Sequence, residues 1–192
     1  MNSIKPIETA YNGYLFRSRL EARWAVFFDS LGIRYEYEAE GYDLPPLPKQ
    51  EALIADINNE FGTIRYLPDF YLSDLDLFVE VKGRALSEKE WGKVVRLAYG
   101  SRKRVALLGS IPHIKNGRVC YQDDGYSGNI LFLLGADIDY YFCECPACGM
   151  VDFQYTGLVD RIKCSCPKGR VVYNSASPRL TQAYQRASMA RF

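Results

Sequence analysis

The sequence predicts an α/β fold in which helices pack on a mixed β-sheet. Segments with helical periodicity and segments with strand periodicity alternate over residues 10–110. An almost wholly apolar strand follows a helix, as a parallel strand does after a crossover helix. Of the 192 residues, 48% are hydrophobic and 14% are aromatic, which is enough to build a core of ordinary size.

The first helix is expected over residues 18–31. Ser18 suits its N-cap, and Gly32 suits its end. Its apolar side chains recur at helical spacing, at Leu20, Trp24, Phe27 and Leu31.

Three strands follow, interrupted by an insertion. Alternation of apolar and polar residues predicts a strand over residues 33–44. Residues 45–62 begin with PPLPKQ and predict a loop, with a short helix at 50–56. Strands over residues 64–72 and 76–83 then form a hairpin.

A second helix is expected over residues 87–100. It begins with a capping box, in which Ser87 is the N-cap and Glu90 lies three residues further on. The apolar residues 104–110 predict a buried strand after this crossover helix. The order is therefore helix, three strands, helix, strand.

The rest of the chain divides into strands, a cysteine-rich module and a terminal helix. Residues 118–122 and 129–134 predict two more strands. A final helix is expected after Ser177 and Pro178. We therefore expect three parts: a core over residues 1–138, a cysteine module over 139–175 and a helix over 176–192.

Residues 66–84, YLPDFYLSDLDLFVEVKGR, place charged side chains within two otherwise apolar strands. If a short loop joins the strands, Asp69 faces Glu80 in the same register in which Leu72 faces Leu77. Lys82 lies on the same face, one strand period beyond Glu80.

Two like charges that face each other in a sheet are destabilising, and desolvation adds to the penalty. A divalent cation between Asp69 and Glu80 reverses this effect, because Mg²⁺ commonly binds through one or two carboxylates. Lys82 would then orient or deprotonate the attacking water, or stabilise charge on a phosphate. The alternative is a solvated polar face of a half-exposed hairpin. The apolar character of both strands favours the metal site.

Glu21 fits two roles. Ser18 and Glu21 match a second capping box, in which the glutamate carboxylate would bind the amide of the N-cap. Glu21 also lies with Ala25 and Phe28 along the edge of the apolar helix face, so it points toward the sheet. The pattern leaves both roles open.

Together these residues resemble the PD-(D/E)XK nuclease superfamily, which carries a glutamate in its first helix, Pro-Asp in one strand and Glu-x-Lys in the next. The matching residues are Glu21, Pro68-Asp69 and Glu80-Val81-Lys82. The stretches FRSRLEARWAVFFDSLGI, YLPDF and VEVKG also look like small nuclease-like proteins of phages and mobile elements. The resemblance implies a restriction-endonuclease-like core of αβββαβ order.

The resemblance also implies an activity, the metal-dependent hydrolysis of phosphodiester bonds. The implied ligands of one or two Mg²⁺ (or Mn²⁺) ions are Glu21, Asp69, Glu80 and the backbone carbonyl of Val81. Lys82 would act on the nucleophilic water. The insertion at 45–62 departs from the pattern of the superfamily.

Five of the six cysteines lie between residues 143 and 166, which favours a metal over disulfides. Cys145-Pro-Ala-Cys148-Gly is typical of a zinc knuckle, and Cys164 and Cys166 complete the four thiolates of a structural Zn²⁺. The module resembles a zinc ribbon, although its second pair is spaced Cys-x-Cys. Cys143 is either a replacement ligand or a spectator, and an iron–sulfur cluster is the alternative metal group.

The leading function is a Mg²⁺-dependent endonuclease acting on DNA, and the same motifs serve RNA cleavage equally well. The alternative is a non-catalytic nuclease-fold protein that binds nucleic acid or a host protein. The net charge is only +1, so any basic binding surface is local. No secretory signal and no membrane span are recognisable. We therefore expect a cytoplasmic protein without a membrane partner, acting alone, as a homo-oligomer or with a protein partner.

Overall fold

The structure, a computed structural model, describes residues 6–49, 62–120, 129–132, 139–155, 164–166 and 174–192. It confirms the predicted α/β class, since the described residues contain three helices and a large mixed sheet. The predicted helix at 50–56 lies outside these residues, as do most of the insertion and the loop between the strands predicted at 118–122 and 129–134.

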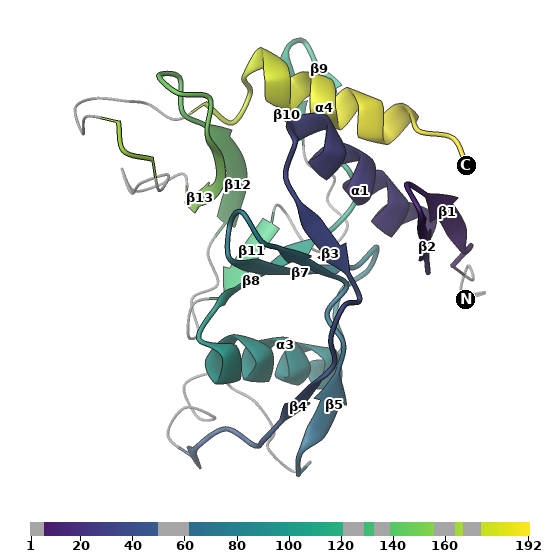
Figure 1. Cartoon of the computed structure of the whole chain (residues 1–192), viewed down its shortest axis with the longest axis vertical. Coiled ribbons are helices and arrows are strands. Elements are labelled where there is room, and N and C mark those ends of the chain that lie inside the picture. The colour runs from purple at the N-terminus through teal and green to yellow at the C-terminus, as the bar shows by residue number, and fades with distance from the viewer. Residues whose placement is uncertain (1–5, 50–61, 121–128, 133–138, 156–163, 167–173) are drawn as a thin grey trace.

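The main sheet has seven strands in the order β13-β12-β11-β8-β7-β6-β3 (Figure 1). β7 and β8 are parallel, as the crossover predicted, and the other neighbouring pairs are antiparallel. The strands are β3 (Tyr35–Tyr37), β6 (Phe70–Leu72), β7 (Leu77–Val81), β8 (Arg104–Leu108), β11 (Asn129–Phe132), β12 (Asp139–Glu144) and β13 (Val151–Tyr155).

Helices lie on both sides of this sheet (Figure 1). α1 (Arg19–Leu31) and α4 (Pro178–Met189) pack against each other on one side, and α3 (Glu88–Ser101) lies on the other. Side chains of β7 alternate between two cores: Val79 packs with α1 and α4, and Phe78 packs with α3. The two faces of β7 are therefore both buried, which explains its almost continuous apolar sequence.

The helix ends follow the predicted capping residues. Ser18, Ser87 and Ser177 each accept a backbone N–H of the first turn. The capping box of Ser87 and Glu90 is complete. Gly32 ends α1 in the left-handed conformation, with φ of 67°.

Two predicted strands are each divided in the structure. Residues 33–44 form β3 and β4 (Tyr42–Leu44), and residues 64–72 form β5 (Ile64–Tyr66) and β6. β4 and β5 pair with each other in a separate two-stranded sheet. The prediction of continuous strands was therefore wrong.

The divisions have local causes. Glu38 adopts a φ of 45°, which turns the chain out of the extended conformation. Pro68 has no N–H to donate to a strand ladder. Asp69 consequently lies in a short gap between β5 and β6, where its side chain is not part of a regular ladder.

Two hairpins contain an Asn-Gly turn that the strand predictions overlooked. β1 (Thr9–Tyr11) pairs with β2 (Tyr14–Phe16), and β9 (His113–Lys115) pairs with β10 (Arg118–Cys120). Both turn residues have positive φ in each case, the conformation that Asn-Gly adopts at low cost. His113, the single histidine of the sequence, is the first residue of β9.

The C-terminal segments join the rest of the molecule. β12 and β13 extend the main sheet, and α4 packs along α1. A division of the chain at residues 138 and 175 stays a prediction. Within the described ranges, none of the helices combines the length and the apolar character that crossing a bilayer requires.

Candidate functional site

The register of the β6–β7 hairpin follows the prediction. Leu72 pairs with Leu77, and Phe70 pairs with Val79. The ladder begins at Phe70, so Asp69 and Glu80 are not a regular ladder pair. Instead, Oδ2 of Asp69 accepts the backbone N–H of Val81 at 2.7 Å. This hydrogen bond holds the Asp69 side chain over β7, beside Glu80.

Glu80 and Lys82 form an ion pair at the end of β7. Oε1 of Glu80 lies 2.6 Å from Nζ of Lys82, and Oε2 accepts the hydroxyl of Tyr66. The backbone N–H of Lys82 donates to the carbonyl of Leu108 at 2.8 Å, which prolongs the pairing of β7 with β8. The Lys82 side chain therefore points toward the carboxylates, as predicted, and only 25% of it is exposed.

Burial and mutual charge perturb this group. Burial raises the pKa of Asp69 well above its usual range, and the charge of Glu80 adds to this effect. Burial lowers the pKa of Lys82, but the charges of Glu80 and Asp69 outweigh it, so the net shift is upward. Lys82 is therefore an ammonium ion at neutral pH.

Glu21 lies at the N-terminal end of α1 and is 7% exposed. Its Oε1 accepts the hydroxyl of Ser18 at 2.7 Å, and its Oε2 accepts the hydroxyl of Tyr37 at 2.6 Å. Oε2 also accepts the backbone N–H of Arg17, one residue before the N-cap, at 3.1 Å. Glu21 therefore holds the start of α1, but through the N–H of Arg17 and the hydroxyl of Ser18 rather than through the N-cap N–H that a capping box uses. Its charge also raises the pKa of Asp69.

Glu38 is a fourth carboxylate at this site, which the sequence analysis missed. Its N–H donates to the carbonyl of Asp69 at 3.0 Å, and its carboxylate pairs with Arg17. Burial raises the pKa of Glu38, and Glu21 and Glu80 add to the shift while Arg17 opposes it. Strand alternation gave no signal for Glu38, because β3 ends at Tyr37 and the positive φ of Glu38 takes its side chain out of the alternating pattern.

The four predicted zinc ligands converge. One Sγ atom from each of Cys145, Cys148, Cys164 and Cys166 lies within 4.8 Å of all the others. Sγ of Cys145 and Sγ of Cys164 are 3.7 Å apart. A tetrahedral zinc site with Zn–S bonds of about 2.3 Å requires about 3.8 Å between sulfurs, so the cysteine cluster fits a zinc ion.

A tight turn holds the first cysteine pair. The N–H of Gly149 donates to the carbonyl of Cys145 at 2.8 Å, and Gly149 has a φ of 72°. Backbone N–H groups of Ala147 and Cys148 lower the pKa of Cys145 to about 7. Cys143 lies outside the cluster, opposite Asp152 in the β12–β13 ladder, and burial raises the pKa of its thiol to about 11.

The carboxylates are arranged differently from the cysteines. Within the described ranges, the cysteine cluster is the one group of three or more His, Cys, Asp or Glu residues whose ligand atoms converge to this degree. Glu21 and Glu80 are held instead by hydroxyl and ammonium donors of the protein. Among the described residues, Asp69 accepts a hydrogen bond through Oδ2 but none through Oδ1, so Oδ1 is not already held by a donor of the protein.

Comparisons of this chain with known protein families, with curated proteins and with solved structures found no match. Its function must therefore be inferred from the two sites themselves.

Proposed function

We propose that this protein is a Mg²⁺-dependent endonuclease of the PD-(D/E)XK type that cleaves DNA. The observation that carries the proposal is the buried, electrostatically coupled pair of Asp69 and Glu80, with Lys82 against Glu80. Lys82 pairs with Glu80, yet burial and the charge of Glu80 still raise the pKa of Asp69, so an ionised Asp69 here is unfavourable without a further cation. Perturbed pKa values of this kind are typical of functional sites.

The order of the elements supports the same superfamily. The motif residues lie on α1, before β6 and on β7, followed by α3 and the parallel strand β8. This is the order of helix, strands, helix and strand that the superfamily pattern requires. Cleavage of RNA would use the same residues, and the assay below separates the two substrates.

The donor set suits Mg²⁺, a cation that prefers oxygen ligands. Asp69, through its open Oδ1, and Glu80 would hold the ion with the carbonyl of Val81, and Glu21 would contribute from α1. The ion would neutralise developing charge on the phosphate and acidify a bound water. Tyr66 and Lys82 now donate to Glu80, so their hydrogen bonds would rearrange when a ligand binds.

Lys82 acts as a positive charge beside the phosphate. Because the net shift of its pKa is upward, it is a poor proton acceptor at neutral pH. Its ammonium would instead stabilise negative charge in the transition state and orient the attacking water.

The cysteine cluster is proposed as a structural zinc site. Cysteines stay reduced in the cytoplasm, where four clustered thiolates bind zinc rather than forming disulfides. We accordingly propose that the protein is cytoplasmic. An iron–sulfur cluster, the alternative, would be recognised by its iron content and visible absorption.

The test of the endonuclease is incubation with supercoiled plasmid, linear duplex and single-stranded RNA, with Mg²⁺ or with chelator. Mg²⁺-dependent nicking of DNA that the Asp69→Asn variant lacks is the expected result. The exposed Asp43, whose ion pair with Arg65 is also exposed, supplies the matched control Asp43→Asn. Metal-independent binding without cleavage of any substrate would instead favour the non-catalytic alternative.

A further inference from the structure

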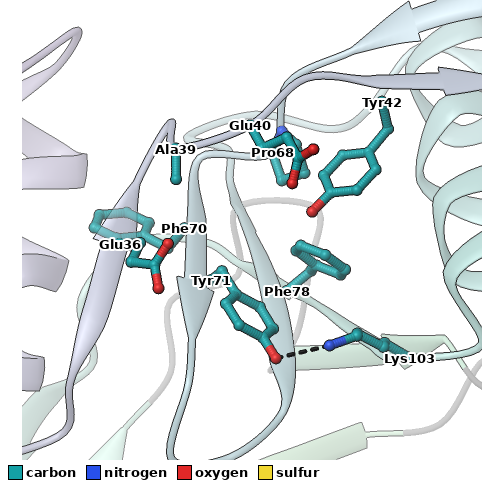
Figure 2. Close-up of a pocket in the computed structure, with 9 residues that line it drawn as sticks. All are labelled: Glu36, Ala39, Glu40, Tyr42, Pro68, Phe70, Tyr71, Phe78 and Lys103. Atoms are coloured by element: carbon teal, nitrogen blue, oxygen red, sulfur yellow. Dashed lines mark hydrogen bonds between the residues drawn. The ribbon is translucent and has the colours of Figure 1, made fainter.

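A cavity of about 270 Å³ opens beside the candidate active site (Figure 2). Its volume is near the lower end of the range for small-molecule sites, about 300 Å³. Its lining combines aromatic rings, two glutamates and one lysine. The lining residues are Glu36, Ala39, Glu40, Tyr42, Pro68, Phe70, Tyr71, Phe78 and Lys103.

The cavity and the carboxylates are neighbours along the chain and on the sheet. Pro68 directly precedes Asp69, and Ala39 directly follows Glu38. Tyr71 and Phe78 form a ladder pair, and Phe78 lies on the same face of β7 as Glu80. A ligand in the cavity would therefore lie next to the proposed cleavage site.

The aromatic rings of the cavity already contact a cation of the protein itself, the ammonium of Lys103. Nζ of Lys103 lies 4.5 Å from the ring centroid of Tyr71 and 2.7 Å from its hydroxyl, and it pairs with Asp76 at 2.6 Å. Figure 2 shows Lys103 extending toward Tyr71 at one end of the cavity. A second cation on these rings would be repelled by the ammonium of Lys103.

Two exposed glutamates line other parts of the cavity. Glu36 is the ladder partner of Tyr71 and lies beside Phe70, whereas Glu40 lies beside Pro68 and Tyr42 (Figure 2). The rings of Tyr42 and Phe78 are 5.4 Å apart, edge to face. The two carboxylates would repel a free phosphate. A neutral planar ring with hydrogen-bond donors on one edge and acceptors on another could meet both the glutamates and Lys103.

We infer that this cavity binds an unpaired nucleobase bearing an exocyclic amino group, next to the phosphate to be cleaved. The inference rests on the proposed nuclease function and adds a preference for the substrate. The amino group would donate to Glu36 or Glu40, as cytosine N4 donates to acidic side chains. Lys103 would donate to a ring nitrogen or carbonyl, and Tyr42 would contact the base face, a mode typical of single-strand binding.

The inference is tested by binding, without cleavage. Fluorescence anisotropy with labelled oligo-dC and oligo-dT is measured in Ca²⁺ at slightly alkaline pH. We expect oligo-dC to bind the wild-type protein at least about fivefold more tightly, the smallest preference that one acidic contact to an amino group gives. The double variant Glu36→Ala, Glu40→Ala removes both acceptors and should bring the two affinities together without lowering the melting temperature, because both side chains are exposed.

The control is Glu8→Ala, since Glu8 is exposed and does not line the cavity. Equal affinities in the wild-type protein, or a preference that survives the double variant, would overturn the inference. If plasmid is still cleaved in that case, the nuclease function stands and only the base site fails. If neither oligonucleotide binds and no plasmid is cut, both fail. Binding of a lysine-rich peptide that the double variant abolishes, without a preference for oligo-dC, would reassign the cavity to a protein partner.

Discussion

The cysteine cluster and the proposed Mg²⁺ site are built in different ways. In the cysteine cluster the four sulfurs converge, and a tight turn within five residues, Cys145 to Gly149, positions the first pair. In the carboxylate site Glu21 and Glu80 are already held by Ser18, Tyr37, Tyr66 and Lys82. The cysteine cluster is arranged so that a metal ion could hold its segment together, whereas Glu21 and Glu80 are held in place by donors of the protein itself.

The two regions are joined through Arg179 of α4. Its Nη1 donates to the carbonyl of Gly149 at 2.8 Å, and its Nη2 donates to the carbonyl of Leu31 at the end of α1. Glu21 lies at the opposite end of the same helix. Arg179 therefore connects the turn of the cysteine cluster to the helix that carries Glu21, a carboxylate of the proposed active site.

The largest effect is expected from loss of the zinc ligands, because structural zinc contributes about 10 kcal/mol or more to the folding of small sites. Elemental analysis should find about one zinc per chain. Cys145→Ser should abolish zinc binding and increase hydrogen exchange around residues 144–151. Cys143→Ala is the matched control and should retain zinc. Iron with a visible absorption band would contradict the zinc assignment.

Asp69→Asn should lower the cleavage rate by about 10³-fold or more, since metal binding supplies several kcal/mol of transition-state stabilisation. Asparagine keeps an acceptor for the N–H of Val81, so the fold should survive. Cleavage at the wild-type rate would place the metal site elsewhere.

The same variant should be more stable than the wild-type protein at neutral pH. The raised pKa of Asp69 means that the folded state retains a proton that the unfolded chain releases above its pKa of about 3.9. Wild-type stability should therefore fall as pH rises above this value, and Asp69→Asn should remove that fall. Thermal melts at pH 4 and pH 7 measure the difference, which should be small at the lower pH. A variant that is less stable at pH 7 would contradict the assigned pKa shift.

Lys82→Ala should lower turnover by about 10²-fold, the contribution of one positioned electrostatic group. Binding of DNA in Ca²⁺ should persist, because the carboxylates remain. Single-turnover cleavage and anisotropy separate the two effects. Lys115→Ala, which removes an exposed lysine of β9, is the control. Parallel losses of binding and turnover in Lys82→Ala would indicate a binding role only.

The smallest effect is expected from replacing Arg179, which connects the cysteine cluster to α1. Arg179→Ala removes two hydrogen bonds from a charged donor to backbone carbonyls, and the side chain is 45% exposed. We expect a loss of about 1–2 kcal/mol in the free energy of unfolding, discounted for this exposure. The control is Arg186→Ala, since Arg186 is an exposed residue of α4. It should change the free energy of unfolding by less than about 0.5 kcal/mol. Equal effects of the two variants would mean that the connection has no structural role.

The features that the sequence determined depend on neighbouring residues. The serine caps of α1, α3 and α4, the knuckle turn around Gly149 and the register of the β6–β7 hairpin each arise within a few residues. The two Asn-Gly hairpins belong to the same category, since their turn signal was present and was not used. A cap, a tight turn or a hairpin can adopt only a few backbone conformations, and the residue types at neighbouring positions determine which one forms.

Tertiary structure decided which distant groups meet. The hydroxyl of Tyr66 reaches Glu80, Arg17 pairs with Glu38, and the β12–β13 hairpin joins the main sheet, although no periodicity links these segments. Glu38 and Pro68 break their strands, and the cavity lies beside the gap that results. These contacts follow from the joint burial of several elements, whose free energy depends on the packing of the whole core rather than on any one stretch of sequence.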